Sequence, residues 1–342
     1  MKRTIKCMAI VIVSFALIAP AHAKEMKKVG QTGLQFLKAD MSARSAGMGG
    51  AFVMAGEDAT AMFHNPAGLG YVSGIDAFAT MTQWIADINY TAAGLAIGLG
   101  NLGTVGVNFI SGDYGDIIGT RLPYLDTDTQ DQIDAGYVET GMLDAVALSV
   151  GATYARRLTD KFLIGGQARY AYQQLGESVL PTTVADSNKT VTNEVSGVAY
   201  EIGTIFYPGI WSSLRVGMDI KNFSQEFEYK EEAFQLPLTF AMGFAVDLFE
   251  IIGMDGGNSL LLAVDALHPR DYTERIHVGT EFTFMNFASV RAGYKFNYDI
   301  ESLTLGGGLN LGLAGFGLRI DAAYSLIEDF DDVLRFTVGA SL

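Results

Sequence analysis

The fold is decided by the stretch RIHVGTEFTFMNFASVRAGYKFNY, residues 275–298. Within it, 275–284 and 288–298 each alternate between two kinds of side chain. One face holds Ile276, Val278, Phe282, Val290, Tyr294 and Phe296, and the other holds Arg275, His277, Glu281, Arg291 and Lys295. Because successive side chains of a β-strand point to opposite faces, this period of two indicates strands with one apolar and one polar face. The short segment between them suits a hairpin turn, so the stretch predicts an antiparallel pair.

The same alternation continues along the chain from about residue 74 to residue 342. We expect fourteen strands, at 74–83, 85–99, 102–112, 144–157, 161–176, 196–207, 213–222, 237–249, 259–267, 273–284, 288–298, 302–313, 315–325 and 333–342. An even number of antiparallel strands is typical of barrels that span outer membranes. The prediction is therefore an all-β fold, a 14-stranded antiparallel transmembrane β-barrel formed by residues 72–342.

The composition agrees with a membrane barrel and disfavours other classes. Of 342 residues, 49% are hydrophobic and 18% charged, with a formal net charge of −15 and a mean hydropathy of +0.23. The apolar share disfavours disorder, and the negative charge disfavours nucleic acid as a partner. After residue 23 there is no run of about 18 apolar residues, so helical spans are not expected. The 40 glycines are more than usual, and we expect them in turns and in the N-terminal segment.

The first residues have the features of a secretory signal. A basic head precedes an apolar run over 8–18 and the small-x-small sequence at 21–23, which predicts a signal peptide over 1–23. The apolar run is too short for a stable membrane-spanning helix. The single cysteine, Cys7, lies inside this segment, so we expect an exported chain without disulfides.

The expected connections alternate in length, as they do in barrels with short periplasmic turns and long extracellular loops. Three connections on one side are long, at 113–143, 177–195 and 223–236. Acidic residues concentrate on that side: 113–144, 223–236 and 326–332 carry net charges of −7, −3 and −4. We therefore expect an acidic extracellular rim.

The polar faces of the expected strands are rich in cations. The candidate lumen cations are Arg169, Arg215, Lys221, Arg275, Arg291, Lys295, Arg319 and Arg335. Charges should face the lumen because they are costly against lipid. Two interpretations stay open: an internal polar network that pairs with acids of a plug, or a cationic path for an anionic head group or peptide.

Residues 24–71 do not alternate and form a separate segment. Asp58 suits a helix N-cap, and the Asn65–Pro66 step ends that helix because a residue before proline avoids the α region. Gly49 and Gly50 allow close approach or positive φ. We expect an N-terminal plug, or hatch, inside the barrel, irregular apart from one short helix.

The plug sequence resembles known families. The strings GLQFLKADMSARSAGMGGAFV (33–53) and DATAMFHNPAGL (58–69) resemble the opening signature of the PorV/PorQ group of outer-membrane proteins. The Asn-Pro-Ala step at 65–67 also resembles a plug motif of FadL-type transporters. Both resemblances imply a 14-stranded barrel with its N-terminal segment in or near the lumen. The motif positions are Arg44, Gly47, Gly49, Gly50, Asp58, Asn65, Pro66 and Ala67, which we expect to hold the plug against the wall.

The resemblances imply two functions for a protein in the outer membrane of a Gram-negative-type bacterium. A PorV-like protein acts in type IX secretion and surface attachment, binding exported proteins that carry C-terminal sorting domains. The alternative is a FadL-like passive transporter of long-chain fatty acids or other hydrophobic compounds, which pass through a lateral opening. A purely structural barrel is the third interpretation. One departure from common barrels is the C-terminal Leu342, where an aromatic residue is usual.

No segment indicates catalysis or a cofactor. The glycine pattern at 98–103 matches a nucleotide motif, but a strand-like stretch follows it where a helix would be needed, so a hairpin turn is expected. His64, His268 and His277 lack metal-ligand spacing. The acidic run at 126–131 lacks the glycine and terminal glutamate of a calcium loop, which favours a solvated loop. We expect no enzyme, no cofactor and no metal.

Overall fold

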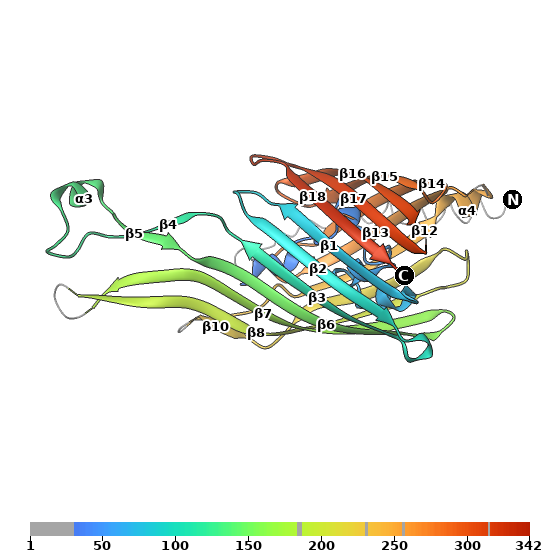
Figure 1. Cartoon of the computed structure of the whole chain (residues 1–342), viewed down its shortest axis with the longest axis horizontal. Coiled ribbons are helices and arrows are strands. Elements are labelled where there is room, and N and C mark those ends of the chain that lie inside the picture. The colour runs from blue at the N-terminus through green and yellow to red at the C-terminus, as the bar shows by residue number, and fades with distance from the viewer. Residues whose placement is uncertain (1–30, 183–186, 230–231, 255–256, 314) are drawn as a thin grey trace.

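The computed structural model describes residues 31–182, 187–229, 232–254, 257–313 and 315–342. The expected signal peptide, 1–23, lies outside the described residues. Fourteen antiparallel strands close into one barrel, in chain order, with β1 pairing to β18 (Figure 1). They are β1 (Ile75–Gln83), β2 (Asn89–Gly98), β3 (Thr104–Asp113), β6 (Ala145–Thr159), β7 (Phe162–Pro181), β8 (Asn188–Phe206), β9 (Arg215–Phe223), β12 (Thr239–Asp247), β13 (Ser259–Pro269), β14 (Arg275–Phe284), β15 (Ala288–Phe296), β16 (Glu301–Leu313), β17 (Phe316–Ile327) and β18 (Val333–Ser341). The predicted barrel is confirmed.

The alternating stretch at 275–298 forms the hairpin β14–β15. Its register runs from Ile276 opposite Phe296 to Phe284 opposite Ala288. Met285 and Asn286 in the turn both have positive φ, as a tight hairpin turn with the twist of its strands requires. Ile276 is 40% exposed and His277 only 5%, so the apolar face points outward and the polar face into the barrel.

The outer wall of the barrel is apolar on all sides. Large exposed side chains include Val150, Ile202, Val290, Leu305 and Phe336, which come from strands all around the barrel. A closed barrel leaves no unpaired strand edge within the hydrocarbon region and presents these side chains to lipid. The molecule is thus built as a transmembrane barrel of the outer-membrane type. Among the described residues, no helix is long and apolar enough to cross a membrane.

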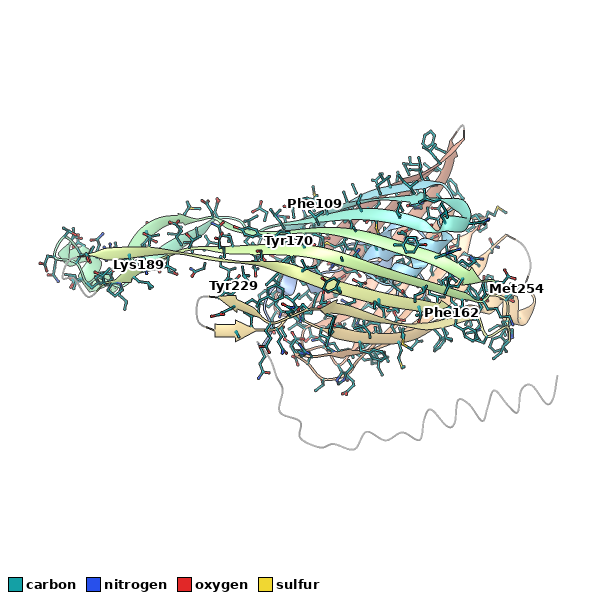
Figure 2. All side chains as sticks on the ribbon, turned by 90° about the horizontal axis from the view of Figure 1, so that it is seen from below. Phe109, Phe162, Tyr170, Lys189, Tyr229 and Met254 are labelled. Carbon is teal, nitrogen blue, oxygen red and sulfur yellow. The ribbon has the colours of Figure 1, made fainter. Side chains whose placement is uncertain are left out.

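Three neighbouring strands, β6, β7 and β8, are longer than the rest, and β7 and β8 continue outward past one end of the barrel (Figures 1 and 2). With them project the hairpin of β4 (Ile117–Arg121) and β5 (Val138–Leu143) and helix α3 (Gln130–Ala135). We call the segment 113–144 together with the outer parts of β7 and β8 the arm. The sequence predicted plain loops here because strands that face water on both sides lose their apolar and polar alternation.

The described part of the N-terminal segment, residues 31–71, lies inside the barrel and contains four short helical pieces. They are η1 (Gln35–Lys38), α2 (Ala43–Gly47), η2 (Ala59–Phe63) and η3 (Pro66–Tyr71). The expected helix capped by Asp58 is η2, where the Asp58 carboxylate accepts a hydrogen bond from the Thr60 amide at 2.9 Å. The plug contains three further helical turns that the sequence did not predict, because pieces of four to six residues are too short to show a helical period.

The connections at the end opposite the arm are mostly short. The glycine pattern at 98–103 forms a turn with the single helical turn η4 (Gly100–Leu102), as predicted. One of these connections contains α4 (Leu248–Ile252). The predicted strand 237–249 ends earlier, at Asp247, because the Asp247 carboxylate caps α4 by accepting from the Phe249 amide at 2.8 Å.

Candidate functional site: the plug and the gap beside β8

The Asn65–Pro66–Ala67 step anchors the plug to the wall. Asn65 caps η3, since its Oδ1 accepts from the Ala67 amide at 3.0 Å. Its Nδ2 donates to the carbonyl of Val53 in the plug at 3.1 Å and to that of Thr204 on β8 at 3.3 Å. Pro66 takes the first helical position, where its missing N–H costs nothing. One buried amide therefore orders the plug and ties it to a strand.

Inward-facing strand glycines let the plug backbone approach the wall. A Cβ atom at Gly203 would lie 1.9 Å from Asn65 Oδ1, and one at Gly165 would lie 2.4 Å from the Pro66 carbonyl carbon. On the other side, a Cβ at Gly293 would lie 2.1 Å from the Gly49 nitrogen. The expectation that the excess glycine belongs to turns and plug was therefore incomplete, because the strands use glycine where a second backbone packs against them.

The plug glycines meet the strands in the same way. Gly47 lies against the backbone of Gly306 on β16, where an added Cβ would be 2.9 Å from the Gly306 Cα. Gly49 and Gly50 have φ values of 66° and 75°, which side chains rarely tolerate. Close packing at these positions depends on the absence of a side chain.

A chain of charges links the plug to β14–β17. The Arg44 guanidinium donates to both carboxylate oxygens of Glu281, at 2.9 and 2.6 Å. Glu281 also accepts from Arg291 at 2.5 Å, and Arg291 donates to Asp321 at 2.7 Å. Each charge is bound by opposite charges, which offsets the cost of burial.

Asp58 belongs to a second ion cluster. Its carboxylate lies 3.5 Å from Arg319 Nε. Both terminal N–H groups of Arg319 donate hydrogen bonds to the Asp76 carboxylate, at 2.7 and 2.8 Å. Asp76 in turn accepts from the Ala59 amide at 3.0 Å. The eight motif positions all lie in the plug, and each of them contacts the wall or caps a helix that does. Ala67 is fully buried, and its amide nitrogen lies 2.5 Å from where a Cβ of Gly165 on β7 would be.

The candidate lumen cations point inward, and within the described residues each has a partner. Besides Arg291 and Arg319, the partners are Glu201 and Gln167 for Arg169, Glu57 for Arg215, Asp219 and the Phe63 carbonyl for Lys221, the rings of Tyr272 and Tyr298 for Arg275, Glu301 for Lys295, and Ser325 and the Asp40 carbonyl for Arg335. This geometry favours the internal polar network over a cationic path for anions.

The plug fills the lumen across its width. Phe36, Met48, Phe52, Met54 and Met62 are almost completely buried between the barrel walls. A compound moving along the barrel axis would have to displace these side chains. The axis of the barrel is therefore closed at the plug.

The start of the plug is held at the arm end of the barrel. Asp271, in the connection between β13 and β14, accepts from Thr32 at 2.8 Å and from the Lys38 ammonium at 2.7 Å. Burial alone would raise the pKa of Asp271, but the hydrogen bonds and the charge of Lys38 hold that pKa below its usual value. Burial also lowers the pKa of Lys38, so the pair is a moderate contact rather than a strong one.

The wall is interrupted beside β8. Strand β9 pairs with β8 only as far as Phe223 opposite Tyr200, and a register shift precedes that point. Asn222 there has a φ of 57°, and its side chain donates to the Pro237 carbonyl at 3.2 Å. The left-handed backbone at Asn222 turns the chain away from β8. Beyond Tyr200, this edge of β8 pairs with no strand that the structure describes.

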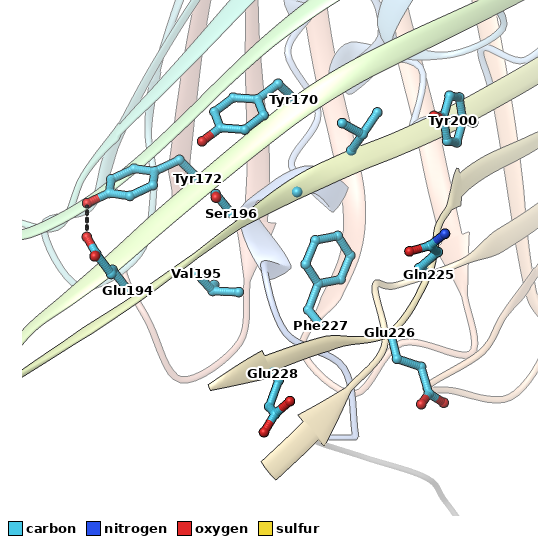
Figure 3. A pocket seen from close by; sticks show the side chains of 12 residues that line it. Tyr170, Tyr172, Glu194, Val195, Ser196, Tyr200, Gln225, Glu226, Phe227 and Glu228 are labelled. Atoms are coloured by element: carbon cyan, nitrogen blue, oxygen red, sulfur yellow. Dashed lines mark hydrogen bonds between the residues drawn. The ribbon is translucent and has the colours of Figure 1, made fainter. Parts of the chain in front are cut away.

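A cavity of about 700 Å³ occupies the interruption (Figure 3). On one side it is lined by outward-facing residues of β7 and β8, including Tyr170 and Tyr200, and on the other by residues 225–228. We call it the β8 gap. Because its lining includes both outward-facing tyrosines and the buried Phe227, it lies between the outer surface and the apolar cluster inside the barrel.

Phe227 forms the inner wall of the β8 gap. It belongs to the short hairpin of β10 (Phe227–Tyr229) and β11 (Glu232–Phe234), and its ring stacks on Phe234. The ring lies against Gly197 of β8, where a Cβ would be only 1.7 Å away. This site was not predicted from the sequence. Its one local signal was an inward-facing glycine inside a strand, which can mark close approach by another group.

A second hollow of about 540 Å³ lies on the outer wall and shares Tyr200 with the β8 gap. Small residues, Ala152, Gly166 and Ala168, line it together with larger ones that include Ile202 and Phe223. The two hollows therefore adjoin on the lipid-facing side of β7 and β8.

Within the acidic run considered as a calcium loop, Asp128 is engaged by its own loop. Asp128 accepts from Arg121 and from the Tyr124 and Leu125 amides at 2.9 Å, so it closes its own loop. Its pKa lies below the ordinary range, chiefly because of the hydrogen bond from Arg121. Among the residues that the structure describes, no group of three or more His, Cys, Asp or Glu is arranged to hold a metal ion.

Comparisons with known proteins support the fold. No protein-family model matches the sequence, and no curated protein matches it significantly. Among solved structures, the CymD monoaromatic hydrocarbon channel superposes with a TM-score of 0.58 at 12% identity, over 91% of this chain and 99% of that one. The Pseudomonas putida toluene transporter TodX gives 0.56 at 12% identity, over 88% and 96%, and a Pseudomonas aeruginosa FadL homologue gives 0.52 at 10%, over 88% and 97%. None of these supports the PorV/PorQ resemblance in particular. The chain shares the fold of FadL-type outer-membrane barrels.

Proposed function

We propose that this protein is a passive transporter through which small hydrophobic compounds cross the outer membrane by way of the β8 gap. The observation that carries the proposal is the cavity of about 700 Å³ at an unpaired strand edge, in a barrel whose axis the plug fills. The named activities of the structural neighbours, a monoaromatic hydrocarbon channel and a toluene transporter, support it. We propose no catalytic role.

The physical reason for a lateral route is the cost of wetting an apolar molecule. Each Å² of apolar surface returned to water costs about 25 cal/mol. A compound that passes from the Phe227 cluster along Val198 and Tyr200 to the hollow near Phe223 follows the apolar side of a gap whose other lining residues are polar. A path along the axis would cross the buried ion clusters at Glu281 and Asp76.

Filling the gap tests the proposal. In a deletion strain complemented with the Ser196→Trp variant, uptake of labelled toluene should fall about tenfold, because the indole would occupy the cavity that Ser196 lines. Thr91→Trp, on the exposed outer face of β2, is the matched control and should transport normally. Equal uptake by both variants, with equal amounts of folded barrel, would contradict the route.

A second candidate function, type IX secretion of proteins with C-terminal sorting domains, is favoured by the arm. Segment 113–144 has a net charge of −7 and exposed apolar residues that include Leu122, which is 73% exposed. Such a surface suits a protein partner. Deleting 116–143 and comparing the cell-surface proteome tests it: unchanged display of sorting-domain proteins would remove this candidate, whereas toluene uptake reports on the first.

A further inference from the structure

We infer that the β8 gap selects hydrophobic compounds that are neutral or positively charged and discriminates against carboxylates. This inference rests on the proposed transport function and specifies its substrate class. It follows from how apolar and acidic side chains are distributed around the cavity.

The inner part of the cavity is apolar and aromatic. Phe227 is 9% exposed and packs against the β8 backbone at Gly197, while Val198 and Tyr200 continue the apolar lining on the outer face (Figure 3). Along the outer face of β8 the side chains change from Ile202, Tyr200 and Val198 to Ser196 and Glu194. An apolar tail therefore fits toward Tyr200 and a polar head toward Glu194.

The rim where that head would lie is acidic. Glu194 lies at this end, Glu226 and Glu228 line the side of the cavity formed by 225–228, and none of the described residues that line the cavity is Lys, Arg or His. Glu194 accepts from the Tyr172 hydroxyl at 3.1 Å, and Glu226 accepts from the Gln235 amide at 2.8 Å. None of the three forms an ion pair with a described cation, so their negative charge stays available to a ligand.

Among the described residues, the lumen cations beside the gap are already engaged. The two lumen cations on the strands beside the gap, Arg169 and Lys221, are bound to groups of the barrel and plug. Lys221 donates to the Phe63 carbonyl at 2.7 Å and lies 3.8 Å from Asp219, and Arg169 donates to Gln167 and lies 3.9 Å from Glu201. A carboxylate entering the gap would have to displace one of these contacts.

Charge therefore separates otherwise similar ligands. A carboxylate head is repelled by the rim, whereas an ammonium is attracted to it and to the faces of aromatic rings. A hydroxyl can donate a hydrogen bond to a rim carboxylate without a charge penalty. We expect an amine to bind about tenfold more tightly than a carboxylate of the same chain length, with the alcohol between them.

The test uses the purified full-length barrel and three probes, dodecylamine, dodecanol and dodecanoate, at about pH 8, where the acid and the amine are both charged. Each displaces a neutral fluorescent hydrophobe from the protein. The expected order of affinity is amine, alcohol, carboxylate. In the Glu194→Gln, Glu226→Gln, Glu228→Gln variant the amine and the carboxylate should bind about equally, with the alcohol unchanged. The matched control, Asp131→Asn, Asp134→Asn and Glu139→Gln in the arm, removes the same charge outside the gap and should keep the wild-type order.

The outcomes separate this inference from the proposed function. Tighter binding of dodecanoate than of dodecylamine, or a preference that survives the loss of all three carboxylates (Glu194→Gln, Glu226→Gln, Glu228→Gln), overturns the inference and leaves transport standing. Failure of all three probes, including the alcohol, overturns the transport function and the inference with it.

Discussion

The wall at β14–β17 and the wall beside β8 both consist of alternating strands, but they differ in how completely those strands are paired. At β14–β17 every strand is paired on both sides, and ion clusters and glycine contacts hold the plug. Beside β8 the pairing stops at Tyr200, and an aromatic side chain takes the place of a strand. The plug is attached to both walls, through ion pairs at β14–β17 and through Asn65 at Thr204 of β8, but among the described residues the outer part of β8 lacks a paired strand on one edge.

The largest expected effect comes from removing a member of the ion cluster at β14–β17. Arg291→Met leaves Asp321 without its cation and Glu281 with one partner fewer, and both carboxylates are buried. Removing one member of a buried ion network costs about 3–5 kcal/mol. We expect a matching fall in the free energy of unfolding, measured by urea titration in detergent. The control Arg156→Met removes an exposed arginine and should stay within about 0.5 kcal/mol of wild type.

A smaller loss should come from the backbone contact in the same region. The Cβ of Gly293→Ala would lie 2.1 Å from the Gly49 nitrogen, so plug or strand must shift. Overpacking of this kind costs about 1–3 kcal/mol. Gly307→Ala on β16 is the control, because its Cβ would meet nothing closer than 3.7 Å. Equal unfolding midpoints for the two variants would show that the plug does not pack as tightly as the structure indicates.

A third change tests how firmly the start of the plug is held. Asp271→Asn removes the charge that binds Lys38 and should expose Lys38 to trypsin, at a cost of about 1 kcal/mol. Because the pKa of Asp271 is lowered in the folded protein, its contribution is present above the unfolded pKa of about 4. It is lost as the pH falls through the lower folded value. Glu274→Gln, an exposed neighbour, should leave Lys38 protected, and cleavage in both variants would argue against a specific contact.

The smallest expected effect concerns the size of the β8 gap. Phe227→Ala widens the β8 gap and should raise uptake of a bulky hydrophobic probe about threefold. Phe336→Ala, an exposed aromatic on the outer face of β18, is the control and should leave uptake unchanged. Slower uptake in Phe227→Ala would mean that the ring guides the compound rather than restricting it.

Particular residues show how far the sequence allowed prediction. The faces of β14 and β15 followed from their alternation, and Asp58 was identified as a cap, because strand period and capping depend on neighbouring residues. The outer part of β7 near Leu180 was missed, because a strand in water on both faces has no reason to alternate. Sequence alone also left open whether Arg169 or Lys221 was free, because their partners are distant in the chain.

The sequence by itself determined the barrel, its strand number and the place of its acidic segments, since period-two patterning and connection length are local properties. Only the tertiary structure decided where strand pairing stops beside β8 and which partners the buried charges have. Both depend on contacts between distant segments, such as Phe227 against Gly197 and Asn65 against Gly203. Glycine is permissive in any turn, and only the packed barrel shows that these two leave room for another part of the chain.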